Sequence, residues 1–113
     1  MLLRFNWIAD TTNGSVPQTA LTAAIKSQVA GWFITKVIII PGLATHIPQD
    51  QYDITLVDNF NIDLADSALM NLPAAGPKQF LFVNQIDNDG FTFTLASNNV
   101  TTATGSCLVY INR

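Results

Sequence analysis

Few side chains in this sequence could act as a nucleophile, a base or a metal ligand. The one histidine, His46, lies in the segment ATHIP, and no second histidine and no glutamate accompany it. A lone loop histidine is most often a solvated surface residue. No serine stands in a nucleophile motif, and the glycines are too dispersed for a phosphate-binding loop. The sequence therefore predicts a protein that is not an enzyme and has no catalytic residue and no cofactor.

Two acidic segments have the mixture of carboxylates and amides that calcium loops use. They are DNFNID at 58–63 and DNDG at 87–90. Neither has the full ligand spacing, and the chain contains no Glu that could supply a bidentate ligand. Turn chemistry accounts for 87–90, which we expect to close a hairpin between two strands. We predict turns without a bound metal at both segments.

The cysteine and the two tryptophans have more than one interpretation. Cys107 stands in an apolar strand pattern, which predicts a buried and unreactive thiol. Trp7 and Trp32 also stand in strand patterns and are expected in the core or in an interface. If their rings were exposed, they could instead bind a sugar, and a small carbohydrate-binding module stays an alternative function.

The composition excludes several classes of partner. Charged residues are 12 % of the chain, about half the usual share of roughly 25 %. The net charge is −3, and the cations are scattered, which argues against nucleic-acid binding. No apolar run approaches the ~20 residues of a membrane span, so no membrane association is expected. The first ten residues, MLLRFNWIAD, lack the apolar run of a signal peptide, which predicts synthesis in the cytoplasm.

Alternating apolar patterns and turn signals predict the elements of the chain. Strands are expected at 2–9, 31–40, 52–58, 78–85, 91–97 and 106–113. In 52–58 the residues Tyr52, Ile54 and Leu56 are expected to face inward. Segment 20–31 fits a short helix, a loop or an irregular strand, and the long connection 59–77 fits one helical turn around 66–70.

No helix is long enough to connect parallel strands, so antiparallel pairing is favoured. We therefore predict an all-β fold, an antiparallel β-sandwich or jelly-roll-like barrel of six to eight short strands. Residues 1–113 are expected to form a single β-sandwich domain, in which 1–28 contributes an N-terminal arm and a variable loop.

The strand FITKVIIIPG is apolar on both faces, although one face of a small sheet is usually polar. Either the fold covers both faces, or a second molecule covers one of them. Because the polar tip of Lys36 must reach solvent, we expect its row to face outward and Phe33, Val37 and Ile39 to face the core. The predicted interface residues are Trp32, Ile34, Ile38 and Ile40 of this segment, together with Trp7 of the first strand.

Two segments, YDITLVD at 52–58 and TTATGSCLVYINR at 101–113, carry a resemblance to a known family. GWFITKVIIIPG and NFNIDLAD are two further segments that carry it. The chain resembles short β-rich virion proteins of tailed bacteriophages, the capsid decoration or cement proteins. The similarity covers about residues 29–113. In the connection, SALMNLPAAGP differs from the Gly/Ala-Asn segment common in the family.

The resemblance implies a homo-oligomeric structural protein on the capsid surface of the virion, made in the host cytoplasm. It would bind the major capsid protein and stabilise contacts between its subunits, because buried interface resists the pressure of the packaged genome. A trimer is preferred over a dimer, since icosahedral shells offer three-fold positions. A tail or fibre protein of the virion is the alternative.

Overall fold

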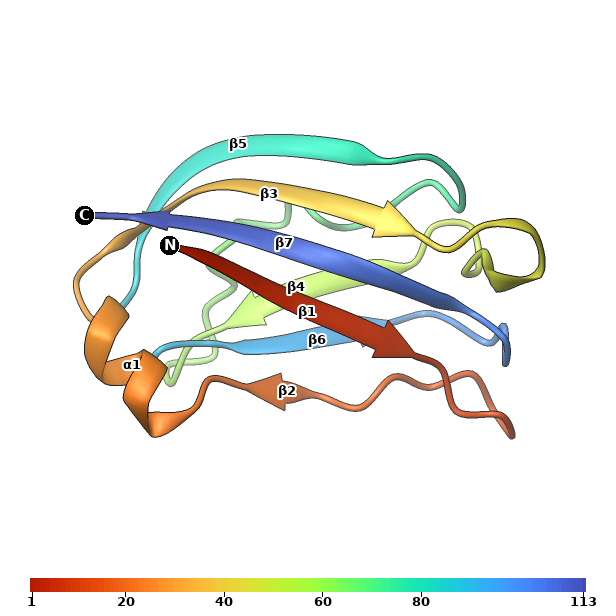
Figure 1. Cartoon of the computed structure of the whole chain (residues 1–113), viewed down its shortest axis with the longest axis horizontal. Coiled ribbons are helices and arrows are strands. Elements are labelled where there is room, and N and C mark those ends of the chain that lie inside the picture. The colour runs from red at the N-terminus through yellow and green to blue at the C-terminus, as the bar shows by residue number, and fades with distance from the viewer.

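Two antiparallel sheets face each other in the computed structural model, which describes residues 1–113 (Figure 1). The larger sheet has the order β1-β7-β3-β5, with β1 at Leu2–Ile8, β7 at Thr104–Asn112, β3 at Phe33–Pro41 and β5 at Lys78–Gln85. The smaller sheet has the order β2-β6-β4, with β2 at Thr19–Ala20, β6 at Thr92–Ala96 and β4 at Asp53–Val57. The predicted all-β sandwich is confirmed.

The chain changes sheet at every connection between strands, so no two consecutive strands pair with each other. The expected hairpin at 87–90 is therefore wrong: β5 pairs with β3, whereas β6 pairs with β2 and β4. The flanking residues explain this path, because Ile86 and Phe91 are both buried. The turn between them leads from one sheet into the other across the core. Gly90, with a φ of +67°, adopts the left-handed backbone that such a turn needs.

The first 31 residues are integrated into the sandwich. Residues 2–8 are a full strand paired with β7, so the expected N-terminal arm is wrong. The ambiguous segment contains a helix, α1 (Ala23–Val29), which covers one end of the sandwich (Figure 1). Thr22 caps it by accepting a hydrogen bond from the Ile25 amide at 3.3 Å. A 3₁₀ turn at Ala44–His46 is the other helical element, and neither helix is long and apolar enough to cross a membrane.

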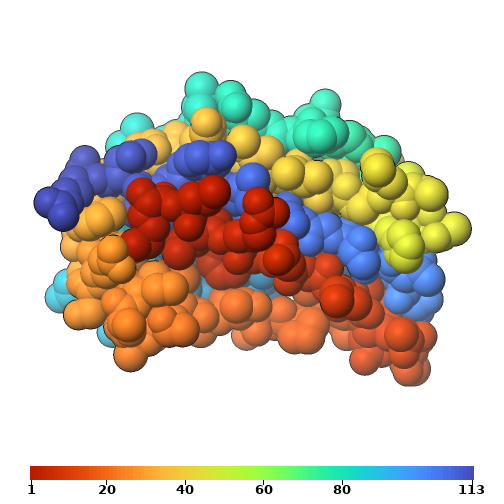
Figure 2. Space-filling model, viewed as in Figure 1, coloured from red at the N-terminus to blue at the C-terminus, as the bar shows by residue number.

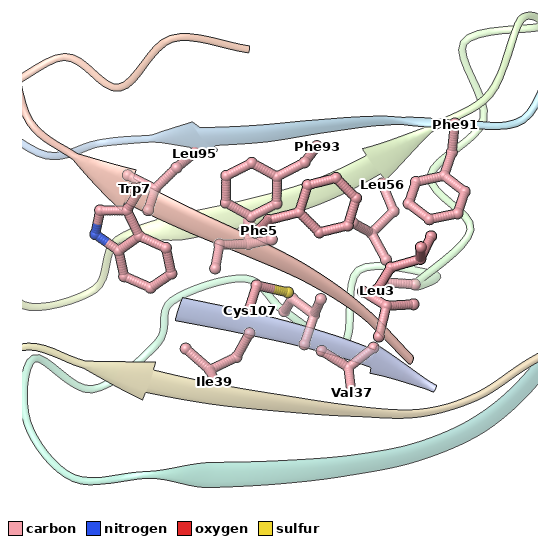
Figure 3. Packing of buried hydrophobic residues seen from close by; sticks show 14 of the residues in the cluster. Leu3, Phe5, Trp7, Val37, Ile39, Leu56, Phe91, Phe93, Leu95 and Cys107 are labelled. Carbon is pink, nitrogen blue, oxygen red and sulfur yellow. The ribbon is translucent and has the colours of Figure 1, made fainter. Parts of the chain in front are cut away.

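Aromatic side chains from both sheets meet in the core (Figure 3). Phe5 stacks on Phe93 with ring centroids 5.2 Å apart, and Trp7 stacks on the same ring at 6.2 Å. Gly105 makes room for the indole, since a Cβ there would lie 2.2 Å from Cζ2 of Trp7. Trp7 is 2 % exposed, so its prediction as an interface residue is wrong.

The strand β3 changes the side on which its side chains lie near Thr35. Its pairing register with both neighbours shifts between Ile34 and Lys36, as at a β-bulge. As a result Ile34 lies on the core side with Val37 and Ile39, while Phe33 is half-buried opposite Asn112. Ile34 as a contact residue and Phe33 as a core residue are therefore wrong, because the bulge breaks the strict alternation on which both predictions depend.

The long connection 58–77 fills the core beneath β5. Its buried residues are Leu64, Ala65, Leu69 and Leu72. The helical turn expected at 66–70 is absent, because Asp66 and Ser67 adopt φ values of 51° and 63°. Successive turns replace it, with the Ala68 amide donating to the Ala65 carbonyl at 2.9 Å.

The bulge makes a prediction that three matched substitutions test. Ile34→Asp and Val37→Asp should prevent folding, because an unpaired buried carboxylate costs several kcal/mol, comparable to the ~5–15 kcal/mol stability of a domain. Ile38→Asp should fold, since its side chain is only partly buried and lies on the outer side beside Leu108. Urea unfolding followed by circular dichroism measures all three. A folded Ile34→Asp variant would contradict the bulge.

Candidate protein–protein interface

The outward side of the four-stranded sheet carries an unusual number of apolar side chains; we call it the outer face. Its exposed members include Ile8 at 75 %, Leu81 at 71 % and Val83 at 70 %. Leu2 and Ile40 are less exposed, Phe33, Ile38 and Tyr110 are partly buried, and Leu108 is covered by its neighbours. The outward residues of the three-stranded sheet, by contrast, include Thr55, Thr92 and Thr94. One sheet thus has the polar outer side typical of a solvated sandwich, and the other does not.

The strand register makes the outer face continuous. One row across it reads Leu2, Tyr110, Lys36 and Leu81. The next row reads Arg4, Leu108, Ile38 and Gln79. Directly opposed side chains on one face of a sheet are in contact, so these rows form one patch.

The outer face contains cations and no carboxylate. Arg4 and Lys36 lie on it, while all eight Asp residues lie outside the four strands of its sheet, and Lys78 is opposite Ile39 on the other side of the sheet. The Tyr110 ring holds one of these cations, with Lys36 Nζ 4.2 Å from the ring centroid. Arg113 Cζ lies 5.0 Å from the ring centroid of Trp32, which packs against the core cluster. A protein with a net charge of −3 therefore presents an apolar face of positive charge.

Three of the five predicted interface residues remain accessible. Ile40 and Ile38 lie on the outer face, and Trp32 is half-buried under Arg113. Trp7 and Ile34 are in the core. The prediction missed Leu81 and Val83, although residues 78–85 are apolar on both faces, and it missed Ile8 at the end of an otherwise regular alternation.

The aspartates have a structural role in the loops. Asp63 accepts three backbone hydrogen bonds: Oδ1 from the amides of Leu56 and Ala65, and Oδ2 from that of Ser67, each at 3.0 Å. Asp58 Oδ1 accepts from the amides of Phe60 at 2.8 Å and Ile62 at 2.9 Å. Asp reaches backbone amides a few residues away in this manner, which the longer Glu does less well. No group of three or more metal-ligating side chains is close together.

The remaining candidates for chemistry are single residues. His46 is exposed, and its Nδ1 lies 2.9 Å from the Thr102 carbonyl oxygen. Cys107 is fully buried, and burial raises the pKa of its thiol to about 12. Burial, with a smaller contribution from Cys107, also raises the pKa of the Tyr52 hydroxyl above its ordinary value. A thiol that stays protonated is a poor nucleophile, so Cys107 is a packing residue.

An open polar depression of about 340 Å³ lies between α1, the end of β4 and the turn before β6. Its lining includes Lys26, Asp58, Asn61, Asp89 and Thr92. Neither tryptophan belongs to it, and the buried ring of Trp7 is unable to stack on a sugar. The geometry that the carbohydrate hypothesis requires is therefore absent for Trp7.

Comparison of the chain with models of protein families, with curated proteins and with solved structures finds no match. Function is therefore argued from the outer face and from the sequence resemblance.

The capping role of Asp63 leads to a prediction about stability. Asp63→Ala should lower the free energy of unfolding by about 1–3 kcal/mol, because the partly buried amides of Leu56 and Ala65 lose their acceptor. Asp89→Ala is the matched control, since Asp89 is exposed and its carboxylate accepts no hydrogen bond; it should change stability by less than about 0.5 kcal/mol. If these loops instead held calcium, a chelator would lower the melting temperature of the wild type. We expect no change.

The buried thiol leads to a prediction about pH. The pKa of Cys107 rises from 9.0 to about 12, so folding keeps the thiol protonated while the unfolded chain ionises it. The stability it contributes is complete below pH 9 and is lost as the pH rises toward 12. The free energy of unfolding should fall over this range, and Cys107→Ala and Tyr52→Phe should each make that fall less steep. Equal slopes in all three proteins would show that these groups are not buried as described.

Proposed function

We propose that this protein is a structural protein of a tailed-bacteriophage virion, which binds the capsid surface and stabilises contacts between major capsid protein subunits. The observation that carries the proposal is the outer face, a continuous apolar patch on a protein with few charges. The sequence resemblance to capsid decoration proteins supplies the identity of the partner. Synthesis in the host cytoplasm and a final location on the virion belong to the same proposal.

The outer face has the chemistry of a protein-binding surface. Apolar side chains lie at its centre, around Leu108 and Ile38, and cations lie among them at Arg4 and Lys36. Interfaces have depleted charge at their cores, and Arg and aromatic residues are enriched there. Because the face has no carboxylate, a complementary partner surface presents carboxylates to it. A capsid subunit with acidic residues near its boundary with a neighbour meets this requirement.

The stabilising effect follows from burial. Each Å² of apolar surface removed from water contributes roughly 25 cal/mol, although the cost of association reduces the net gain. A protein seated across a boundary adds this interface to both subunits, so separation of the subunits must also expose the outer face. No bound cofactor and no chemical reaction is required.

Charge reversal tests the proposal. Lys36→Glu should weaken binding to purified capsids that lack this protein by tenfold or more, because it places a carboxylate at the centre of an interface with carboxylates. Lys26→Glu, an equal charge change on α1 away from the outer face, should alter binding less than about twofold. Co-sedimentation with the capsids measures both. Equal effects of the two variants, or none for Lys36→Glu, would contradict binding through the outer face.

A further inference from the structure

The strand β5 is an edge of the four-stranded sheet with which no other part of the chain pairs. It is the outermost strand of that sheet, and in the space-filling view its residues form a rim (Figures 1 and 2). Its backbone pairs with β3, and the ladder continues through Ile86 to Gly31 and Trp32. No backbone hydrogen bond joins the other edge of β5 to any part of the chain. The peptide groups along that edge are therefore free to pair with another strand.

The other sheet edges are protected within the chain. β4 is covered by the connection that follows it, through hydrogen bonds such as Leu64 amide to Leu56 carbonyl at 2.8 Å and Ile54 amide to Leu69 carbonyl at 2.9 Å. β2 is only two residues long, and Pro17 precedes it closely. β1 has no backbone partner on its outer edge, but it carries the charge of Arg4. Proteins usually shorten, cover or charge their edges in these ways.

In β5 the charge and the proline are confined to one end, at Lys78 and Pro77. From Gln79 to Gln85 the strand contains no charge, no proline and no glycine. Two of its side chains, Leu81 and Val83, are among the most exposed apolar residues of the protein. A long, neutral and apolar edge is a template for strand addition, so a stable protein of this type requires an occupant at β5.

The sequence of β5 is nearly symmetric about Phe82, which identifies the occupant. In QFLFVNQ, an antiparallel copy centred on Phe82 places Leu81 opposite Val83 and Gln79 opposite Gln85. The Leu81–Val83 pairs are apolar and the Gln79–Gln85 pairs are amides, while Phe80 lies opposite Asn84 on the other side of the strand. In the same register Lys78 lies opposite Ile86 of the second copy, which marks the two ends of the contact. An isologous two-fold contact requires this self-complementarity.

We propose that β5 pairs antiparallel with β5 of a second copy of this chain, about a two-fold axis at Phe82. The pairing joins two four-stranded sheets into one continuous eight-stranded sheet. A two-fold contact closes after two copies, so it forms a dimer in place of the trimer expected from the sequence resemblance. The inference concerns the purified chain alone and is independent of binding to a capsid.

Sedimentation equilibrium of the purified protein tests the pairing. The wild type should be a dimer, and the double variant Leu81→Lys/Val83→Lys should dissociate, with a dissociation constant raised at least a hundredfold, because four lysines then meet across the axis. The matched control is Ile8→Lys/Leu43→Lys, which places the same charges at exposed apolar residues outside β5; it should remain a dimer. A wild-type monomer or trimer, a dimeric Leu81→Lys/Val83→Lys variant, or a control that dissociates equally would overturn the proposal.

Disulfide cross-linking tests the register independently of affinity. A mixture of Leu81→Cys and Val83→Cys proteins should form cross-linked heterodimers under mild oxidation, because directly opposed residues lie within disulfide reach. Each protein alone should cross-link much more slowly, since its cysteines are then diagonal neighbours at about 7–8 Å. The native Cys107 is buried and should not compete. Faster cross-linking in either single protein than in the mixture would overturn the two-fold axis at Phe82.

Discussion

The β-bulge at Thr35 in β3, where the alternation of side chains changes side, is the constraint on which the rest of the structure depends. β3 lies between β7 and β5, so its side chains determine both the core and the outer face. With strict alternation, a strand that buried Ile34 would also bury Lys36 and lose Val37 from the core. The bulge keeps Ile34 and Val37 inside and places the Lys36 ammonium over the Tyr110 ring. Thr35 Oγ1 secures it by accepting a hydrogen bond from Asn112 Nδ2 at 2.7 Å.

Negative and positive charges lie in different parts of the molecule because carboxylates cap the backbone amides of the loops. Carboxylates are needed where backbone amides lack partners, and those amides lie in the loops that connect the two sheets. Asp residues are consequently concentrated at the ends of strands and in the connection 58–77. The inner strands β7 and β3 have their amides paired on both sides, and β1 and β5 have theirs paired along the inner edge, so these strands need few caps. Their outer face can therefore be apolar and positive, and this is the surface on which both the capsid proposal and the edge pairing depend.

The strands and most of their inward-facing residues were predictable from the sequence. The pairing of the strands and the bulge in β3 were not. Alternation correctly placed Tyr52, Ile54 and Leu56 inside, because each strand shows its period locally. The turn at 87–90 was recognised, but its residues do not specify whether the next strand stays in the same sheet. The bulge has no composition signal at Thr35. The burial of Trp7 depends on the missing side chain at Gly105, a residue distant in sequence that only pairing brings close.

The outer face as the surface that meets a partner is the central claim, and an electron cryo-microscopy map of virions that carry this protein tests it most directly. The map locates the chain on the particle and resolves which sheet faces its neighbours. We expect the four-stranded sheet to lie against major capsid protein subunits, with carboxylates of the shell near Arg4 and Lys36 and the threonine-bearing sheet toward solvent. A chain that contacts the shell through the three-stranded sheet, or that is found only in the tail, would contradict the account.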